Sequence, residues 1–600
     1  MPNKHQNFKV ALYIRALDIA PLHGDITPFK ERFEMIRRNV DLDKVYIETH
    51  RDLVIPDETT LMALKDYFRE LGIQTAGGIT VTINERDNFK TYCYSNPVYR
   101  EKLKEIVTLT ARLFDEVIFD DFFFTNCKCP LCIKEKGEKS WTNFRLEQMT
   151  KASRELVLEP ARKTNPNVRI VIKYPNWYEH FQGLGFNLKD QPPIYDGIYT
   201  GNETRDAVRS AQHLQPYESY LIFRYFENIK PGGNLGGWVD PFGSRYLDRY
   251  AEQLWLTLFS KAPEITLFDY FSVQIPIRES QRGPWQGQGT SFSFDAVTGP
   301  LRQADGSLPP RANMALAAGA ALKQVDSFLG QLGKPIGVKS YKPYHSLGED
   351  FLHNYLGMLG IPLDLVPEFP SEEQTILLTE SAKYDPDIVS KIKAQLMAGK
   401  KVIITTGLLK ALQEKGLQDI VEMECTNQKM IVQDFMFLRS PYLYKADKPM
   451  IVPVVHYLTN DSWEEISCIG GTTGTPLLHS AAYGNSKLYI LTIPDNFDDL
   501  YHLPVEVLNR IRETIARDLF VRLEAPAQVC LFVYDNDTFI VESFLDESVD
   551  VRLVLDKSSK IQDLVSGEVF SLSEGERRDG NKELALTIKP HSFRAFRAVK

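Results

Sequence analysis

Four of the seven cysteines are concentrated in one short stretch of the chain, where they could bind a metal ion. Cys93 lies in the segment TYCYSNPVYR, and Cys127, Cys129 and Cys132 form a C-x-C-x-x-C motif. Four thiolates can close a tetrahedral zinc site, and a site closed by four cysteines leaves no open position for catalysis. An iron–sulfur cluster and buried free cysteines are the alternatives. We expect a structural zinc and no organic cofactor.

Polar side chains also follow a series of short apolar runs, and many of them are carboxylates. Hydrolysis of a glycosidic bond needs two carboxyl groups that face each other across the sugar. Structural ion pairs are the alternative for any single residue. The residues that close the runs are Arg15, Glu48, His50, Asp120, Asp121, Lys173, Asn176, Trp177, Asn202, Glu203, Arg205, Arg224, Glu227 and Asp269.

The apolar runs are predicted to be the strands of a (β/α)8 barrel. Segments with helical spacing of apolar residues separate them, over a length typical of this fold. An open doubly wound sheet is less favoured, because no glycine-rich phosphate turn follows the first strand. The predicted strands span residues 8–15, 43–50, 72–82, 115–121, 168–175, 196–203, 219–227 and 264–271.

Two further domains are predicted after the barrel, which we expect to span residues 1–332 with its linker and connecting helix. Residues 333–520 alternate buried-type strands with helices, which indicates a doubly wound α/β domain. Its strand ends lack a Cys-His-Glu constellation, so we expect it to be non-catalytic. Residues 521–600 contain strands and turns alone, which indicates a small antiparallel β-sandwich.

Composition excludes several classes of partner. The net charge of −9 gives no basic surface for nucleic acid. No apolar run is long enough to cross a bilayer, so we expect no membrane partner. The N-terminus lacks a signal peptide, which favours the cytoplasm; a periplasmic or secreted location would require a leader removed from this chain.

The order of these motifs resembles glycoside hydrolase family 42, whose members are β-galactosidases with a zinc site in the barrel. The resemblance rests on Cys93 followed by S-N-P-x-Y-R, on the acidic end of strand four, and on the C-x-C-x-x-C motif. It implies an α/β domain similar to glutamine amidotransferases, a small β-domain and assembly into a homotrimer. It also implies a carbohydrate substrate and a retaining, two-carboxylate mechanism.

The resemblance assigns the catalytic residues, with one departure from the family pattern. Asp120-Asp121 stands where the family has Asn-Glu at the end of strand four. Asp121 would then be the acid/base, and Glu227 in RYFENIK would be the nucleophile at the end of strand seven. The residues expected to bind the sugar are Asp120, Glu203, Arg224, Asp269, Trp238, Asn202 and Trp177.

Two rival interpretations remain open. In one, Asp120 or Asp121 is the nucleophile and Glu203 is the acid, as in barrels whose nucleophile lies on strand four. In the other, the barrel binds carbohydrate without cleaving it, which the loss of the expected glutamate favours.

Overall fold

The computed structural model describes residues 4–177, 179–458, 462–556, 558–574 and 581–599. The chain divides into two compact units, Met1–Gln286 with Phe292–Gly330 and Gly287–Ser291 with Gln331–Lys600. Among the described helices, none combines the length and the hydropathy that a membrane-spanning segment needs.

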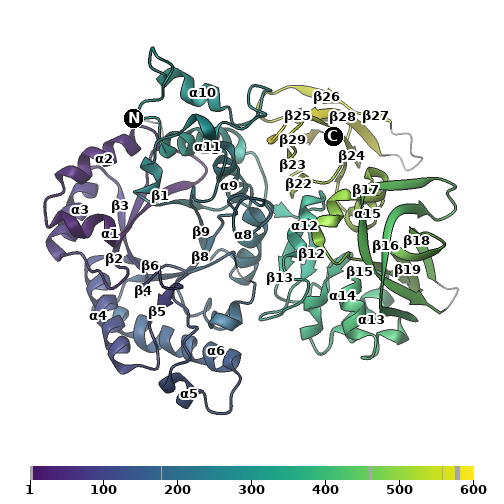
Figure 1. Cartoon of the computed structure of the whole chain (residues 1–600), viewed down its shortest axis with the longest axis horizontal. Coiled ribbons are helices and arrows are strands. Elements are labelled where there is room, and N and C mark those ends of the chain that lie inside the picture. The colour runs from purple at the N-terminus through teal and green to yellow at the C-terminus, as the bar shows by residue number, and fades with distance from the viewer. Residues whose placement is uncertain (1–3, 178, 459–461, 557, 575–580, 600) are drawn as a thin grey trace. The chain divides into compact units, whose positions relative to one another are not determined.

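The described part of the first unit contains a closed barrel of eight parallel strands (Figure 1). It closes because β1 (Lys9–Ile14) pairs in parallel with both β2 (Lys44–His50) and β10 (Glu264–Phe268). The other strands are β3 (Gln74–Ile79), β6 (Glu116–Phe119), β7 (Arg169–Tyr174), β8 (Gly197–Gly201) and β9 (Asn234–Val239). The predicted (β/α)8 barrel is confirmed.

Helices surround the barrel and begin at sequence signals that are easily recognised. Asp57 accepts a hydrogen bond from the Thr60 N–H at the start of one helix, and Asn96 caps another that begins with Pro97. The longer helices are α2 (Thr27–Arg37), α3 (Glu58–Glu70), α4 (Pro97–Leu113), α6 (Trp141–Ala152), α8 (Glu218–Ile229), α9 (Leu247–Phe259) and α11 (Met314–Leu329).

One predicted barrel strand is wrong. Residues 219–227 lie in helix α8, and the seventh strand is β9, in the glycine-rich segment that follows this helix. Eight of the twelve residues of α8 are buried, and its unbroken apolar run at 220–223 has the length and composition of a buried strand. In β9, glycine is needed for packing. A Cβ on Gly236 would lie 2.3 Å from Tyr199 Oη, and one on Gly237 would lie 2.4 Å from Thr257 Cγ2.

The second unit contains a mixed α/β sheet, as predicted, with an antiparallel extension that was not predicted. The described strands follow the order β13-β12-β14-β15-β20-β19-β18-β16-β17. The first five pair in parallel: β13 (Leu363–Val366), β12 (Val338–Tyr341), β14 (Thr375–Leu378), β15 (Lys401–Thr405) and β20 (Ser486–Leu491). The antiparallel strands are β19 (Thr473–Tyr483), β18 (Ser462–Gly470), β16 (Met423–Phe437) and β17 (Leu443–Tyr457). The longer helices are α13 (Ile388–Met397) and α15 (Val505–Ala516).

The C-terminal residues form two antiparallel sheets that share one apolar core, as the sandwich prediction requires. One sheet contains β11 (Pro335–Ile336), β22 (Val529–Tyr534), β23 (Thr538–Ser543), β29 (Ser592–Val599), β25 (Lys560–Asp563) and β26 (Val569–Ser571). The other contains β21 (Val521–Glu524), β24 (Val549–Leu555), β28 (Lys582–Ile588) and β27 (Ser573–Glu574).

The packing of β9 gives a test of the barrel. Gly236→Ala should destabilise the protein by about 1–3 kcal/mol, because the new methyl group overlaps the buried Tyr199 ring. Calorimetry should therefore show a lower melting temperature for the barrel transition. Gly299→Ala is the control, because a Cβ there meets nothing within 4 Å. Equal melting temperatures for the two variants would contradict this packing.

Candidate functional site

A cavity of about 560 Å³ opens at the C-terminal ends of the barrel strands. This is the face where barrel enzymes carry their active sites, and the volume lies within the usual range of about 300–1,000 Å³ for ligand sites. The lining residues are Arg15, Arg51, Glu85, Asn88, Phe89, Asp120, Asp121, Phe122, Phe124, Asn126, Lys173, Trp177, Leu184, Glu203, Arg205, Gln212, Trp238, Asp240, Phe242 and Phe268.

A buried ammonium group lies among the carboxylates of this cavity. Lys173, on β7, has its Nζ 2.9 Å from Asp121 Oδ2, 3.2 Å from Asp120 Oδ1 and 3.9 Å from Glu203 Oε1. The same Nζ lies 4.3 Å from the centre of the Trp238 ring. Residues from the ends of β6, β7, β8 and β9, the fourth to seventh strands of the barrel, therefore converge on one point.

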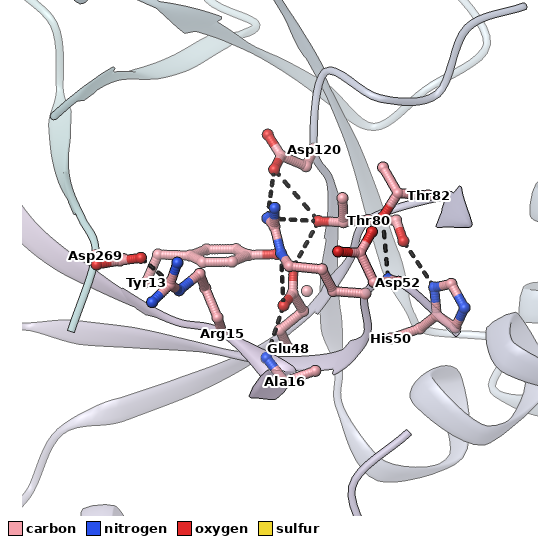
Figure 2. Close-up of polar contacts among 12 residues, drawn as sticks. Tyr13, Arg15, Ala16, Glu48, His50, Asp52, Thr80, Thr82, Asp120 and Asp269 are labelled. Carbon is pink, nitrogen blue, oxygen red and sulfur yellow. Dashed lines mark hydrogen bonds and ion pairs between the residues drawn. The ribbon is translucent and has the colours of Figure 1, made fainter. Parts of the chain in front are cut away.

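Asp120 is held as a structural anion. Its Oδ1 accepts hydrogen bonds from the Asp121 N–H and from Lys173, and its Oδ2 accepts one from Arg51. Burial alone would raise the pKa of Asp120, but the charges of Lys173 and Arg51 lower it to about 2. Arg51 also pairs with Glu48, which accepts hydrogen bonds from Tyr13 and Thr80 (Figure 2). Hydrogen bonds and ion pairs to neighbouring residues thus occupy both oxygens of the ionised Asp120 carboxylate.

Asp121 and Glu203 differ from Asp120 in that their pKa values are raised rather than lowered. Burial, with the Asp120 charge, raises the pKa of Asp121 to about 6, although Lys173 opposes the shift. Burial, with the charges of Asp240 and Asp121, raises the pKa of Glu203 to about 7. Glu203 Oε2 is buried and has no hydrogen-bond partner among the described residues. Near neutral pH, one of these carboxyls favours its ionised form while the other retains much of its proton.

Asp240 is a cavity carboxylate that sequence analysis missed. It directly follows β9 and forms an ion pair with Arg205, whose Nη2 lies 2.8 Å from Asp240 Oδ2. The signal was the apolar Trp238-Val239 pair before an acidic residue, the pattern that closes other barrel strands. Because strand seven was predicted at residues 219–227, Asp240 was not recognised as a residue at the end of a strand.

Several predicted binding residues lie in or beside the cavity. Trp177 and Trp238 line it, together with Asp120 and Glu203. Asp269 does not line the cavity, but Arg15 does. Asp269 Oδ2 lies 2.5 Å from Arg15 Nε. Asp269 therefore orients a cavity cation rather than contacting the cavity itself (Figure 2).

Three predicted site residues lie elsewhere. Glu227 and Arg224 belong to helix α8 rather than to a strand end, so placing them at the barrel mouth was wrong. Glu227 Oε1 accepts a hydrogen bond from the Gly232 N–H. Asn202 follows β8 but donates to the Ser219 carbonyl, which ties the strand to α8. None of the three lines the described cavity.

The four clustered cysteines converge as predicted and can hold a metal ion. Their sulfur atoms all lie within 4.8 Å of one another, and Cys93 Sγ lies 3.6 Å from Cys129 Sγ and 3.5 Å from Cys132 Sγ. A tetrahedron with metal–sulfur bonds of about 2.3 Å separates its sulfurs by about 3.8 Å. The cluster therefore fits a four-thiolate site, and it joins the segment before α4 to the loop after β6 and to helix α5 (Pro130–Lys136).

Family models match three successive parts of the chain. Residues 1–331 match the model described as probable glycosyl hydrolase, catalytic domain. Residues 333–496 match the second domain of uncharacterized protein SSO3021, and residues 520–598 match the probable glycosyl hydrolase, C-terminal domain. The chain is 25% identical to that SSO3021 protein of Saccharolobus solfataricus, over 99% of this chain and 100% of the relative.

Solved structures share the fold over the full length. Gan42B, a GH42 β-galactosidase from G. stearothermophilus, is 13% identical with a TM-score of 0.63, covering 99% of each chain. The α-L-fucosidase isoenzyme 2 of Paenibacillus thiaminolyticus is 12% identical, also with a TM-score of 0.63, covering 99% of this chain and 100% of that one. At these identities the likeness shows the fold alone.

Metal analysis tests the cysteine cluster. We expect the purified protein to carry about one metal ion per chain, the number that a four-thiolate site binds. Cys132→Ser should lose that ion, because the substitution removes one of the four ligands. Cys425→Ser is the matched control, since Cys425 is a buried free cysteine outside the cluster. Mass spectrometry for metals measures all three proteins, and metal-free wild-type protein would refute the site.

Proposed function

Because the chain belongs to the probable glycosyl hydrolase family, we propose that its cavity hydrolyses a glycosidic bond with Asp121 and Glu203 as the reacting carboxyl groups. The observation that carries the proposal is the position of Lys173 Nζ, 2.9 Å from Asp121 Oδ2 and 3.9 Å from Glu203 Oε1. The two oxygens can be separated by no more than the sum of these distances. That limit lies well below the roughly 9.5 Å that bounds a working carboxyl pair.

Glu203 acts as the general acid. Its buried Oε2, which has no hydrogen-bond partner among the described residues, can donate a proton to the glycosidic oxygen. Burial, with the neighbouring carboxylates, raises the pKa of Glu203 to about 7. A general acid is most effective when its pKa lies near the working pH. As the bond between the anomeric carbon and the leaving oxygen breaks, the proton passes from Glu203 to that oxygen.

Asp121 acts as the nucleophile. The Lys173 ammonium group stabilises its ionised form, whereas Asp120 is saturated by hydrogen-bond donors. Its carboxylate attacks the anomeric carbon and forms a glycosyl ester as the leaving group departs. Water then cleaves the ester, and Glu203 takes up the water's proton, which gives overall retention. This pairing is the rival that sequence analysis left open, and it replaces Glu227 as nucleophile.

The sugar is selected by the cavity walls rather than by the fold. Solved neighbours with this fold include a β-galactosidase and an α-L-fucosidase. One barrel fold can host many specificities. The substrate is therefore a glycoside or oligosaccharide whose identity depends on lining residues such as Trp177 and Trp238.

We also propose that the cysteine cluster holds zinc and that the chain forms a homotrimer. Thiolate ligands in a tetrahedral, closed set favour a structural zinc ion. Cys93, Cys127, Cys129 and Cys132 would hold it, keeping the loop that follows Asp121 in place. The trimer rests on the resemblance to family 42.

Substitution of the carboxyl groups tests the catalytic pair. On a panel of aryl glycosides, Asp121→Ala and Glu203→Ala should each lower kcat by about 10³-fold or more, since each removes a group that acts in the transition state. Glu227→Ala is the matched control and should keep near-normal activity, because Glu227 lies on α8.

Azide separates the two roles. With Asp121→Ala it should give a glycosyl azide of inverted configuration, and with Glu203→Ala one of retained configuration. An inactive Glu227→Ala would contradict the assignment. Glycan binding by wild-type protein without turnover of any substrate would support a carbohydrate-binding barrel instead.

The pH dependence tests the ionisation states. Activity requires ionised Asp121 and protonated Glu203, so it should fall below about pH 6 and above about pH 7, the two pKa values. Asp240→Asn removes a neighbouring anion that raises the Glu203 pKa, so the basic limb should move to lower pH while turnover persists. Complete loss of turnover in Asp240→Asn would contradict a purely electrostatic role for Asp240.

A further inference from the structure

An exposed aromatic ring lies at the edge of the cavity, on a small hairpin. The hairpin consists of β4 (Thr82–Asn84) and β5 (Lys90–Thr91) and follows barrel strand β3. In its turn, Phe89 is 54% exposed and yet lines the cavity. A single exposed apolar side chain is ordinary, whereas a contiguous apolar surface beside a cavity marks a binding groove.

The ring belongs to an aromatic wall that begins next to the proposed nucleophile. The Phe89 and Phe122 rings stack with their centres 5.5 Å apart and their planes 23° apart. Phe122 directly follows Asp121, and Phe124 continues the wall with its ring 6.3 Å from that of Phe122. All three phenylalanines line the cavity.

Exposure increases from the floor of the cavity to its rim. Trp238 is 1% exposed, Asp121 is 4% exposed and Phe89 is 54% exposed. On this basis we place the ring of the cleaved sugar on the enclosed side, at Trp238, and the departing group on the open side, where Phe89 lies.

The hairpin is fixed in place by polar contacts. The Glu85 carboxylate pairs with Arg51, and the Glu85 N–H donates to Asp52 Oδ1 at 3.0 Å. Asn88 and Phe89 both adopt left-handed backbone, with φ of 51° and 53°. This conformation is costly for residues other than glycine and persists where surrounding contacts hold it.

We propose that Phe89, stacked on Phe122, forms the binding platform for the leaving group of the substrate. The chemistry that it recognises is a flat apolar face, either the C–H face of a second sugar ring or an aryl group. The inference rests on the proposed function, which it extends from bond cleavage to the recognition of the departing part.

Two substrates with the same sugar and different leaving groups test the platform. A 4-nitrophenyl glycoside reaches Phe89, whereas the corresponding glycosyl fluoride has a leaving group too small to do so. Phe89→Ala should lower kcat/KM for the nitrophenyl glycoside about tenfold, the loss of one aromatic contact, and leave the fluoride within about twofold. Phe89→Trp should retain activity on both. Tyr442→Ala, which removes another exposed ring in the second unit, should change neither.

An equal loss on both substrates would overturn the platform, because it would show that Phe89 supports the catalytic groups instead. Unchanged kcat/KM for the nitrophenyl glycoside would overturn it as well. If wild-type protein turns over no glycoside at all, the proposed function fails. In that case, titration calorimetry measures the binding of the same 4-nitrophenyl glycosides to wild-type and Phe89→Ala protein, which tests the platform independently of catalysis. Weaker binding by Phe89→Ala supports it, and equal binding, or no binding by either protein, refutes it.

Discussion

The ammonium group of Lys173 is the interaction on which the cavity depends. It is buried with Asp120, Asp121 and Glu203 at the end of the barrel, where no carboxylate could remain ionised without a counter-charge. Loss of that charge would leave the carboxylates to repel one another and take up protons. The cation therefore allows several acidic groups to share one enclosed site.

The barrel provides the alignment that this interaction needs. Strand β7 pairs in register with β6 on one side and with β8 on the other, for example Phe119 with Ile172 and Lys173 with Tyr199. Parallel neighbours end at the same face, so side chains from strands four, five and six meet there without a long loop. Tyr199 and Trp238 fill the barrel below, in the same apolar cluster. The rigid core thus fixes the distances among groups far apart in sequence.

Much of this arrangement could be predicted from sequence, and the failures have physical causes. Asp121, Glu203 and the four cysteines were found because strand ends and a cysteine motif are local signals. Strand seven was misplaced because the unbroken apolar run of α8, residues 220–223, resembles a buried strand, whereas β9 is rich in glycine. The glycines of β9 are required because any larger side chain would overlap Tyr199 or Thr257, which are distant in sequence. That single error moved the expected nucleophile to Glu227 and hid Asp240.

The departure from Asn-Glu at strand four follows from charge balance. Asp120 lies between Arg51 and Lys173, two buried cations that an uncharged asparagine would leave partly uncompensated. Its carboxylate neutralises them and accepts three hydrogen bonds, from the Asp121 N–H, Lys173 and Arg51. Asp121 is left with Lys173 as its charged partner, so its carboxylate remains available for chemistry. An aspartate pair at this position is therefore compatible with an active site that carries its own lysine.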